Sequence, residues 1–166
     1  AAHAARTLPA RPVSGRATSQ STFELEELTL AQLQEGLRSG RWTARTLAEQ
    51  YFARIDALDR RGPNLHALLE PNPDALALAD QSDAERRGRG ARGPLHGIPV
   101  LIKDNIDTHD RMHTSAGSLA LADSIAPRDS GVAERLRAAG AVLLGKTNLS
   151  EWANFRGRRS ISGWSA

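Results

Sequence analysis

Two short apolar segments with a helical pattern between them constrain the fold of this chain more than any other feature. The first, Gly97–Asn105, is apolar until it ends in charged and polar residues, and the second is Ala141–Leu144. Between them, Ser130 is placed to cap a helix over about 131–139. A strand, a helix and a second strand in this order predict an α/β fold whose strands are buried in a sheet.

The part of the chain before this unit predicts helices. Thr29 begins a capping-box pattern with leucines at helical spacing behind it, and a second amphipathic stripe follows in Ala44–Leu58. The short apolar run Leu65–Glu70 predicts a strand, and Asp74 begins a third helix. We therefore expect an N-terminal helical region over residues 22–92 and a sheet-forming region over residues 93–166.

The amino-acid composition argues against several classes of protein function. The 166 residues hold 22 basic and 19 acidic side chains, a net charge of +3, so the charge does not favour a nucleic-acid partner. No cysteine is present, which excludes disulfides, cysteine-ligated zinc and a cysteine nucleophile. No apolar run approaches the roughly 18 residues of a membrane span. The composition leaves the compartment open between cytoplasm and export to the periplasm, and it leaves the oligomeric state open.

The first residues of the chain predict a leader segment, and the last residues predict a truncation. Residues 1–21 are rich in Ala, Arg, Ser and Pro, which is typical of a disordered leader or of the remnant of an export signal. Trp164 lies two residues from the last residue, and a bulky aromatic side chain there favours a truncated chain.

Two motif matches are better explained without a bound ligand. Gly140–Thr147 fits the letters of a phosphate-binding loop, but its middle residues are those of a sheet interior and a helix precedes it. His109 and His113 have the spacing of a zinc helix but lack its glutamate and stand in a polar stretch, which favours a loop. The sequence therefore predicts neither a nucleotide nor a metal cofactor.

Lys103 ends the most apolar strand and is one of only two lysines in the chain. If both faces of the strand are covered, its ammonium group is desolvated, which favours the neutral amine that a general base requires. The alternative is that Lys103 only ends a strand and pairs with Asp104 or Asp107, and spacing alone favours this alternative because lysines are rarely buried.

Several ordered motifs resemble those of the amidase signature family. They are the run Gly93–Asp107, the run Thr114–Ser118 and the run Ala139–Asn148. The stretches Ser150–Arg156 and Ser160–Ala166 look like those of the bacterial branch that contains peptide amidase. The resemblance covers about residues 26–166 and implies the N-terminal portion of the amidase signature fold, a mixed β-sheet flanked by helices and incomplete in this chain.

The resemblance also implies roles for particular residues. The family uses a Ser–cis-Ser–Lys triad, in which Lys103 would be the catalytic lysine, with Asp104 and Asn105 orienting it. Ala153 and Asn154 align with positions that line the substrate pocket in some relatives. Lys146 falls in what looks like a structural turn of the family.

The resemblance places both triad serines beyond Ala166, so this chain would carry only the lysine of the triad. The implied activity is hydrolysis of amide bonds, with C-terminal peptide amides or other primary amides as substrates and no cofactor. Two alternatives stay open. One is a component of the glutamyl-tRNA amidotransferase type, which works with partner subunits, and the other is a non-catalytic fragment.

Overall fold

The computed structural model describes residues 23–153, so the predictions for the leader, Asn154 and the last twelve residues lie outside the described part. The elements in chain order are α1 (Leu30–Ser39), α2 (Ala44–Ile55), a π-helical turn (Asp56–Arg60), β1 (Leu68–Pro71), α3 (Ala75–Arg89), β2 (Pro99–Lys103), a 3₁₀ turn (Leu119–Leu121), α4 (Gly131–Ala138), β3 (Val142–Thr147) and a second 3₁₀ turn (Glu151–Ala153). Within residues 23–153, no helix combines the length and the apolar character that a membrane crossing requires.

The predicted helices are confirmed, with capping as the local cause. Thr29 and Gln32 form the predicted capping box of α1, and Thr43 forms one with Thr46 at the start of α2. Helix α2 gains a second cap from a distant residue: the buried carboxylate of Asp83 on α3 accepts hydrogen bonds from the amides of Ala44 and Arg45. This contact ties the first turn of α2 to α3.

Strand β1 begins three residues later than the sequence predicts. Asn64 and His66 have positive φ, so the chain is not extended there, and Leu65 is exposed. The carboxylate of Asp59 accepts hydrogen bonds from the amides of Ala67 and Leu68, which is where the strand starts. A side chain eight residues earlier sets this boundary, and an apolar run cannot reveal that.

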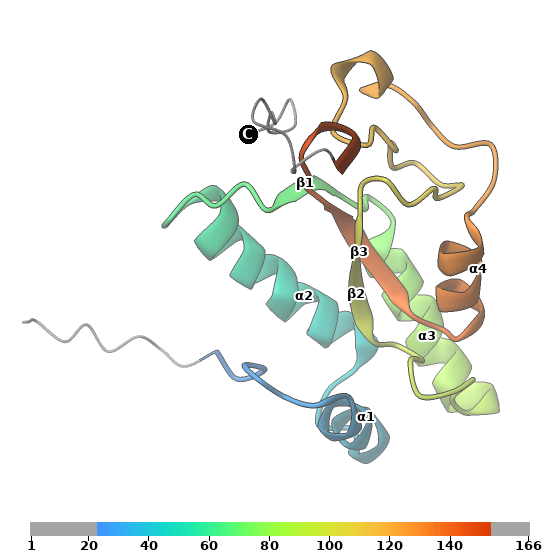
Figure 1. The fold of residues 1–166 in the computed structure, drawn as a ribbon. Helices are drawn as coiled ribbons and strands as arrows, with labels where there is room; N and C mark the ends of the chain where they lie inside the picture. The colour runs from blue at the N-terminus through green and yellow to red at the C-terminus, as the bar shows by residue number, and fades with distance from the viewer. Residues whose placement is uncertain (1–22, 154–166) are drawn as a thin grey trace, which may run out of the picture.

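The three strands form one mixed sheet in the order β1-β3-β2, seen in Figure 1. Strand β3 is parallel to β2, with α4 as the connection between them, and antiparallel to β1. The predicted mixed α/β architecture is therefore confirmed. The prediction that β2 is buried is wrong: it lies at the edge of the described sheet, Leu101 is 40% exposed, and Lys103 is exposed.

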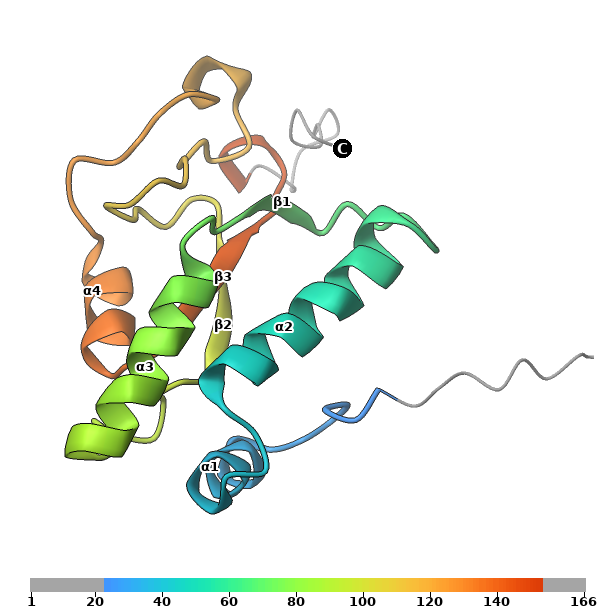
Figure 2. The same cartoon turned by 180° about the vertical axis from the view of Figure 1, so that it is seen from behind.

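Helices cover the sheet on both faces. Small residues of α2 and α3, namely Ala44, Ala48, Ala75 and Ala79, pack tightly against Val142 and Leu144 of β3. On the opposite face, Leu143 packs with Ile102 and Met112, and Leu136 of α4 lies against this cluster. Figures 1 and 2 show α2 and α4 on opposite sides of the strands. The central strand β3 is buried by both layers.

A β-bulge on β3 changes which way its last residues face. Val100 pairs with Leu143, but Leu101 pairs with Gly145, so Leu144 is an extra residue on β3. After the bulge, Lys146 lies beside Ile102 in the register and shares its face, toward Met112 and the loops that follow β2. The prediction that Lys146 belongs to a turn is wrong, because β3 continues through Thr147 and Lys146 is fully buried.

Gly145 is required by the close approach of β1. A Cβ atom at this position would overlap the carbonyl oxygen of Glu70 and lie 3.1 Å from the Cα of Pro71. We predict that Gly145→Ala destabilises the fold by about 1–3 kcal/mol, since backbone atoms cannot move aside cheaply. Thermal or urea unfolding measures the change.

Gly88→Ala is the matched control for this prediction. Gly88 lies in α3 with open space around its Cα, so an alanine there is expected to be neutral or to stabilise the helix by up to about 1 kcal/mol. Equal effects of the two substitutions would contradict the role assigned to Gly145.

The burial of Lys146 predicts a pH dependence of stability. Desolvation lowers the pKa of its ammonium group, and nearby carboxylates, Asp104 first among them, oppose this only in part. The unfolded chain therefore binds more protons at this residue than the folded chain does, until the pH reaches the ordinary lysine pKa of about 10.4. We predict that the stability of the wild type, relative to Lys146→Met, increases as the pH rises from 7 toward that value. A difference that stays constant, or that falls, would contradict the prediction.

Candidate functional site

Lys103 is the last residue of β2, at the carboxyl end of the two parallel strands. Its side chain shares a strand face with exposed Leu101 and points away from Ile102. Within the described residues it forms no ion pair with Asp104 or Asp107, so the alternative of a strand-ending lysine paired to either aspartate is not what the structure shows. The amine is exposed at the end of β2 in the described part of the chain.

Asp104 lies on the other face and is 1% exposed. Its Oδ2 accepts hydrogen bonds from the amide of Ser115 at 3.1 Å, from the hydroxyl of Ser115 and from the amide of Gly117. Its carbonyl accepts a hydrogen bond from the amide of Ala116. The residue next to Lys103 is therefore clamped to the loop that carries Ser115, and this contact fixes the end of β2.

The two other described residues that were expected at the site, Asn105 and Ala153, lie in different turns. Asn105 is exposed in the turn after β2. Ala153 is exposed in the turn after β3, and this turn is held against the loop that carries Ser115. There the hydroxyl of Ser118 donates to Glu151 at 2.8 Å, and the amide of Trp152 donates to the carbonyl of Ala116. The structure thus brings Ala153 to the same end of the sheet as Asp104.

Lys146 connects the two segments that surround Asp104. Its Nζ donates to the carbonyl of Ile106 and to the hydroxyl of Thr114, both at 2.8 Å. These contacts also confirm that the Gly140–Thr147 run is not a phosphate-binding loop: Val142–Thr147 is an extended strand, and the lysine binds the protein's own groups.

A cavity of about 300 Å³ lies beside this network. Glu70, Asp104, His113 and Ser115 are among the residues that line it. Glu70 accepts from both the amide and the Nδ1 of His113, at 2.8 and 3.0 Å, so the histidine is held by a carboxylate. The stretch from His109 to His113 is a loop, as predicted. Within residues 23–153, no three His, Asp or Glu side chains are grouped to hold a metal ion.

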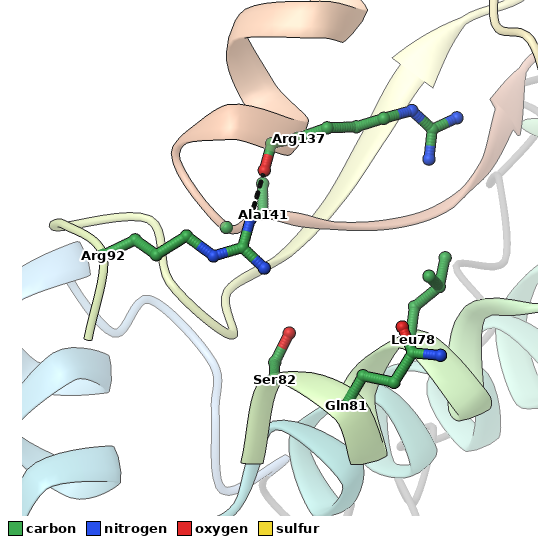
Figure 3. A pocket seen from close by; sticks show the side chains of 7 residues that line it. Leu78, Gln81, Ser82, Arg92, Arg137 and Ala141 are labelled. Atoms are coloured by element: carbon green, nitrogen blue, oxygen red, sulfur yellow. Dashed lines mark hydrogen bonds between the residues drawn. The ribbon is translucent and has the colours of Figure 1, made fainter. Parts of the chain in front are cut away.

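A smaller hollow of about 140 Å³ lies at the opposite end of β3, between α3 and α4, and Figure 3 shows it from close by. Two arginines line it, but their charges are already paired. Arg92 binds Glu85 and donates to the carbonyl of Arg137, and Arg137 binds Asp110 and Asp129. The hollow is therefore a poor anion site, and the chemistry-bearing residues gather at the other end.

Sequence reasoning missed most of the network around Asp104. The run Thr114–Ser118 is part of the family resemblance, but nothing in its letters says that Ser115 contacts Asp104 or that Ser118 contacts Glu151. The burial of Lys146 could have been predicted from its position, because it directly continues the apolar stretch that holds Leu143 and Leu144. A lysine that continues a buried strand must find acceptors inside the protein.

Comparisons with known proteins identify the family of this chain. The model of the Amidase family matches residues 46–162, well over half of the chain. A probable amidase of Arabidopsis thaliana is 45% identical over 148 residues, which is 88% of this chain and 28% of that protein. A glutamyl-tRNA(Gln) amidotransferase subunit of Chloroflexus aurantiacus is 46% identical over 131 residues, 78% of this chain and 26% of that protein.

Among solved structures, the native peptide amidase of Stenotrophomonas maltophilia is 56% identical, with a TM-score of 0.80, over 86% of this chain and 29% of that one. The chain thus spans less than a third of the length of these relatives. The family match, the sequence identities and the shared fold lead to one conclusion: the chain belongs to the amidase family.

Proposed function

We propose that the protein to which this chain belongs hydrolyses the carbon–nitrogen bond of primary amides, with C-terminal amides of peptides as the preferred substrates. The observation that carries the proposal is the placement of Lys103. It ends β2 with its side chain exposed, while Asp104 beside it is buried and clamped. The 56% identity to a peptide amidase supports the peptide amide as substrate.

In the proposed mechanism, Lys103 is a general base. Its neutral amine takes a proton from a bridging serine, which takes the proton of a second serine, and that serine attacks the amide carbon. The protonated lysine returns its proton through the bridging serine to the amide nitrogen, the carbon–nitrogen bond breaks, and ammonia leaves behind an acyl-serine. Water then gives up a proton to the same relay and attacks the acyl carbon, and the relay returns that proton to the serine oxygen as the ester bond breaks and the carboxylic acid is released. Burial of Lys103 under the rest of the protein would favour the neutral amine, since desolvation disfavours the charged form.

Both serines of this scheme are proposed to lie in the part of the protein that follows Ala166. The hydroxyls of Ser115 and Ser118 are engaged by Asp104 and Glu151. They serve the clamp and the neighbouring turn, and we assign them no role as nucleophile.

A second candidate is the corresponding component of an amidotransferase, which a 46% identity over 131 residues favours. Such an enzyme is expected to depend on partner subunits and on a tRNA-bound substrate. Co-purification with a second subunit, together with no hydrolysis of a peptide amide by the isolated protein, would favour this candidate over the first.

We predict that Lys103→Ala in the complete protein lowers kcat by roughly 10²–10⁴-fold, because a general base contributes about that factor. Circular dichroism checks that the variant of the complete protein is folded. Ammonia release from an amidated peptide measures kcat.

Arg38→Ala is the control for the loss of an exposed cation. Arg38 lies at the end of α1 and pairs only with Glu35 of the same helix in the described part, so its loss should leave kcat unchanged. Near-normal turnover by Lys103→Ala would refute the assigned role of Lys103.

We also predict that the 166-residue chain alone does not hydrolyse amides, because the proposed nucleophile and its oxyanion-binding amides are not in it. The purified chain is mixed with an amidated peptide, and ammonia is measured against the complete protein at equal concentration. Circular dichroism checks that the chain is folded. Hydrolysis by the folded chain would contradict the proposal that the nucleophile lies in the part of the protein that follows Ala166.

A further inference from the structure

We propose that Lys146 is a positioning residue for amide hydrolysis: its buried ammonium group fixes the turn that begins at Lys103. The proposal rests on the proposed function of Lys103 and adds a second lysine that acts through it without contacting the substrate. Lys146 lies on β3, and its side chain is fully buried on the face opposite to that of Lys103.

Two hydrogen bonds in series connect Lys146 to the backbone of Lys103. The amide of Ile106 donates to the carbonyl of Lys103 at 3.0 Å, which closes a tight turn after β2. The carbonyl of Ile106 in turn accepts a hydrogen bond from Nζ of Lys146 at 2.8 Å. The far end of the turn is therefore anchored to the central strand of the sheet, and its near end is the backbone of Lys103.

The same ammonium group also holds the loop that clamps Asp104. Nζ of Lys146 donates to the hydroxyl of Thr114, and Thr114 directly precedes Ser115, which binds the Asp104 carboxylate. One ammonium group thus holds the turn that follows Lys103 and the loop that holds Asp104. If it is lost, both supports of the end of β2 are loosened together.

Stability alone does not call for a lysine at this position. An ammonium group buried in a protein is costly, and an apolar side chain of similar size usually costs less. Met is unbranched, only one atom shorter than Lys, and would fill most of the same space. What a methionine cannot do is donate to Ile106 and Thr114 at once. The β-bulge at Leu144 aims the side chain at these two acceptors.

The test compares variants of the complete protein in the hydrolysis of an amidated peptide. We expect Lys146→Met to lower kcat by about 10²-fold, since a displacement of about 1 Å costs that much in a positioned reaction. KM should change far less, because no contact with substrate is removed. Lys146→Arg keeps a cation with several donors and should recover part of the lost kcat.

Thr114 supplies a second, milder pair of variants in case Lys146→Met does not fold. Thr114→Val keeps the shape of the side chain but removes the acceptor for Lys146, and it should lower kcat with little effect on KM. Thr114→Ser keeps the hydroxyl and should restore kcat. If the folded Lys146→Met and Thr114→Val variants both keep the wild-type kcat, the proposal is wrong.

Asp83→Asn is the matched control for the loss of a buried charge. Asp83 caps α2 through Ala44 and Arg45, so the variant should lower the melting temperature and leave the kcat of the folded protein unchanged. An equal fall in kcat with Asp83→Asn would mean that any loss of stability lowers turnover, and it would overturn the specific role of Lys146.

A measurement without substrate separates this proposal from the proposed function. Hydrogen exchange of the amides of Ile106 and Ser115 should be faster in Lys146→Met than in the wild type, and unchanged in Asp83→Asn. If the wild type hydrolyses no primary amide, the proposed function fails. Unchanged exchange in Lys146→Met would then overturn the positioning role as well, independently of activity.

Discussion

The buried ammonium group of Lys146 is the interaction on which the carboxyl end of the sheet depends. It lies where β3, the turn after β2 and the loop before Ser115 meet, and it binds an acceptor in each of the two loops. Burial lowers the pKa of this lysine, because removal from water destabilises the charged form of its amine. The two hydrogen bonds and the nearby carboxylates offset part of that cost, and the hydrogen bonds anchor the two loops at the end of β2, the strand that presents Lys103.

The helices that pack on both faces of the sheet support this end of it. Alanines of α2 and α3 bring two helices close to β3, and Asp83 ties the helices to each other. The opposite face is closed by α4 and the loop around Met112. Leu101 and Lys103 of the edge strand β2 stay exposed in the described part, which is where the proposed remainder of an amidase would complete the site.

The sequence correctly predicted those helices and strands that are determined by residues close to one another in the chain. The capping box of α1, the amphipathic stripe of α2 and the apolar pattern of β3 each depend on residues that lie close together in the sequence. The features that it missed depend on distant partners. Asp59 sets the start of β1, and a bulge turns Lys146 into the interior. The candidate site follows from family resemblance, whereas the contacts of Asp104 with Ser115 needed the three-dimensional structure.

The most direct test of the role of Lys146 is a pair of crystal structures of the complete protein, the wild type and Lys146→Met. We expect the turn from Lys103 to Ile106 and the loop at Thr114 to be displaced or disordered in the variant. Helices α2 and α3 and most of β3 should stay in place. If the variant shows the turn and the side chain of Lys103 where the wild type has them, the end of β2 does not depend on the buried lysine, and its central role is refuted.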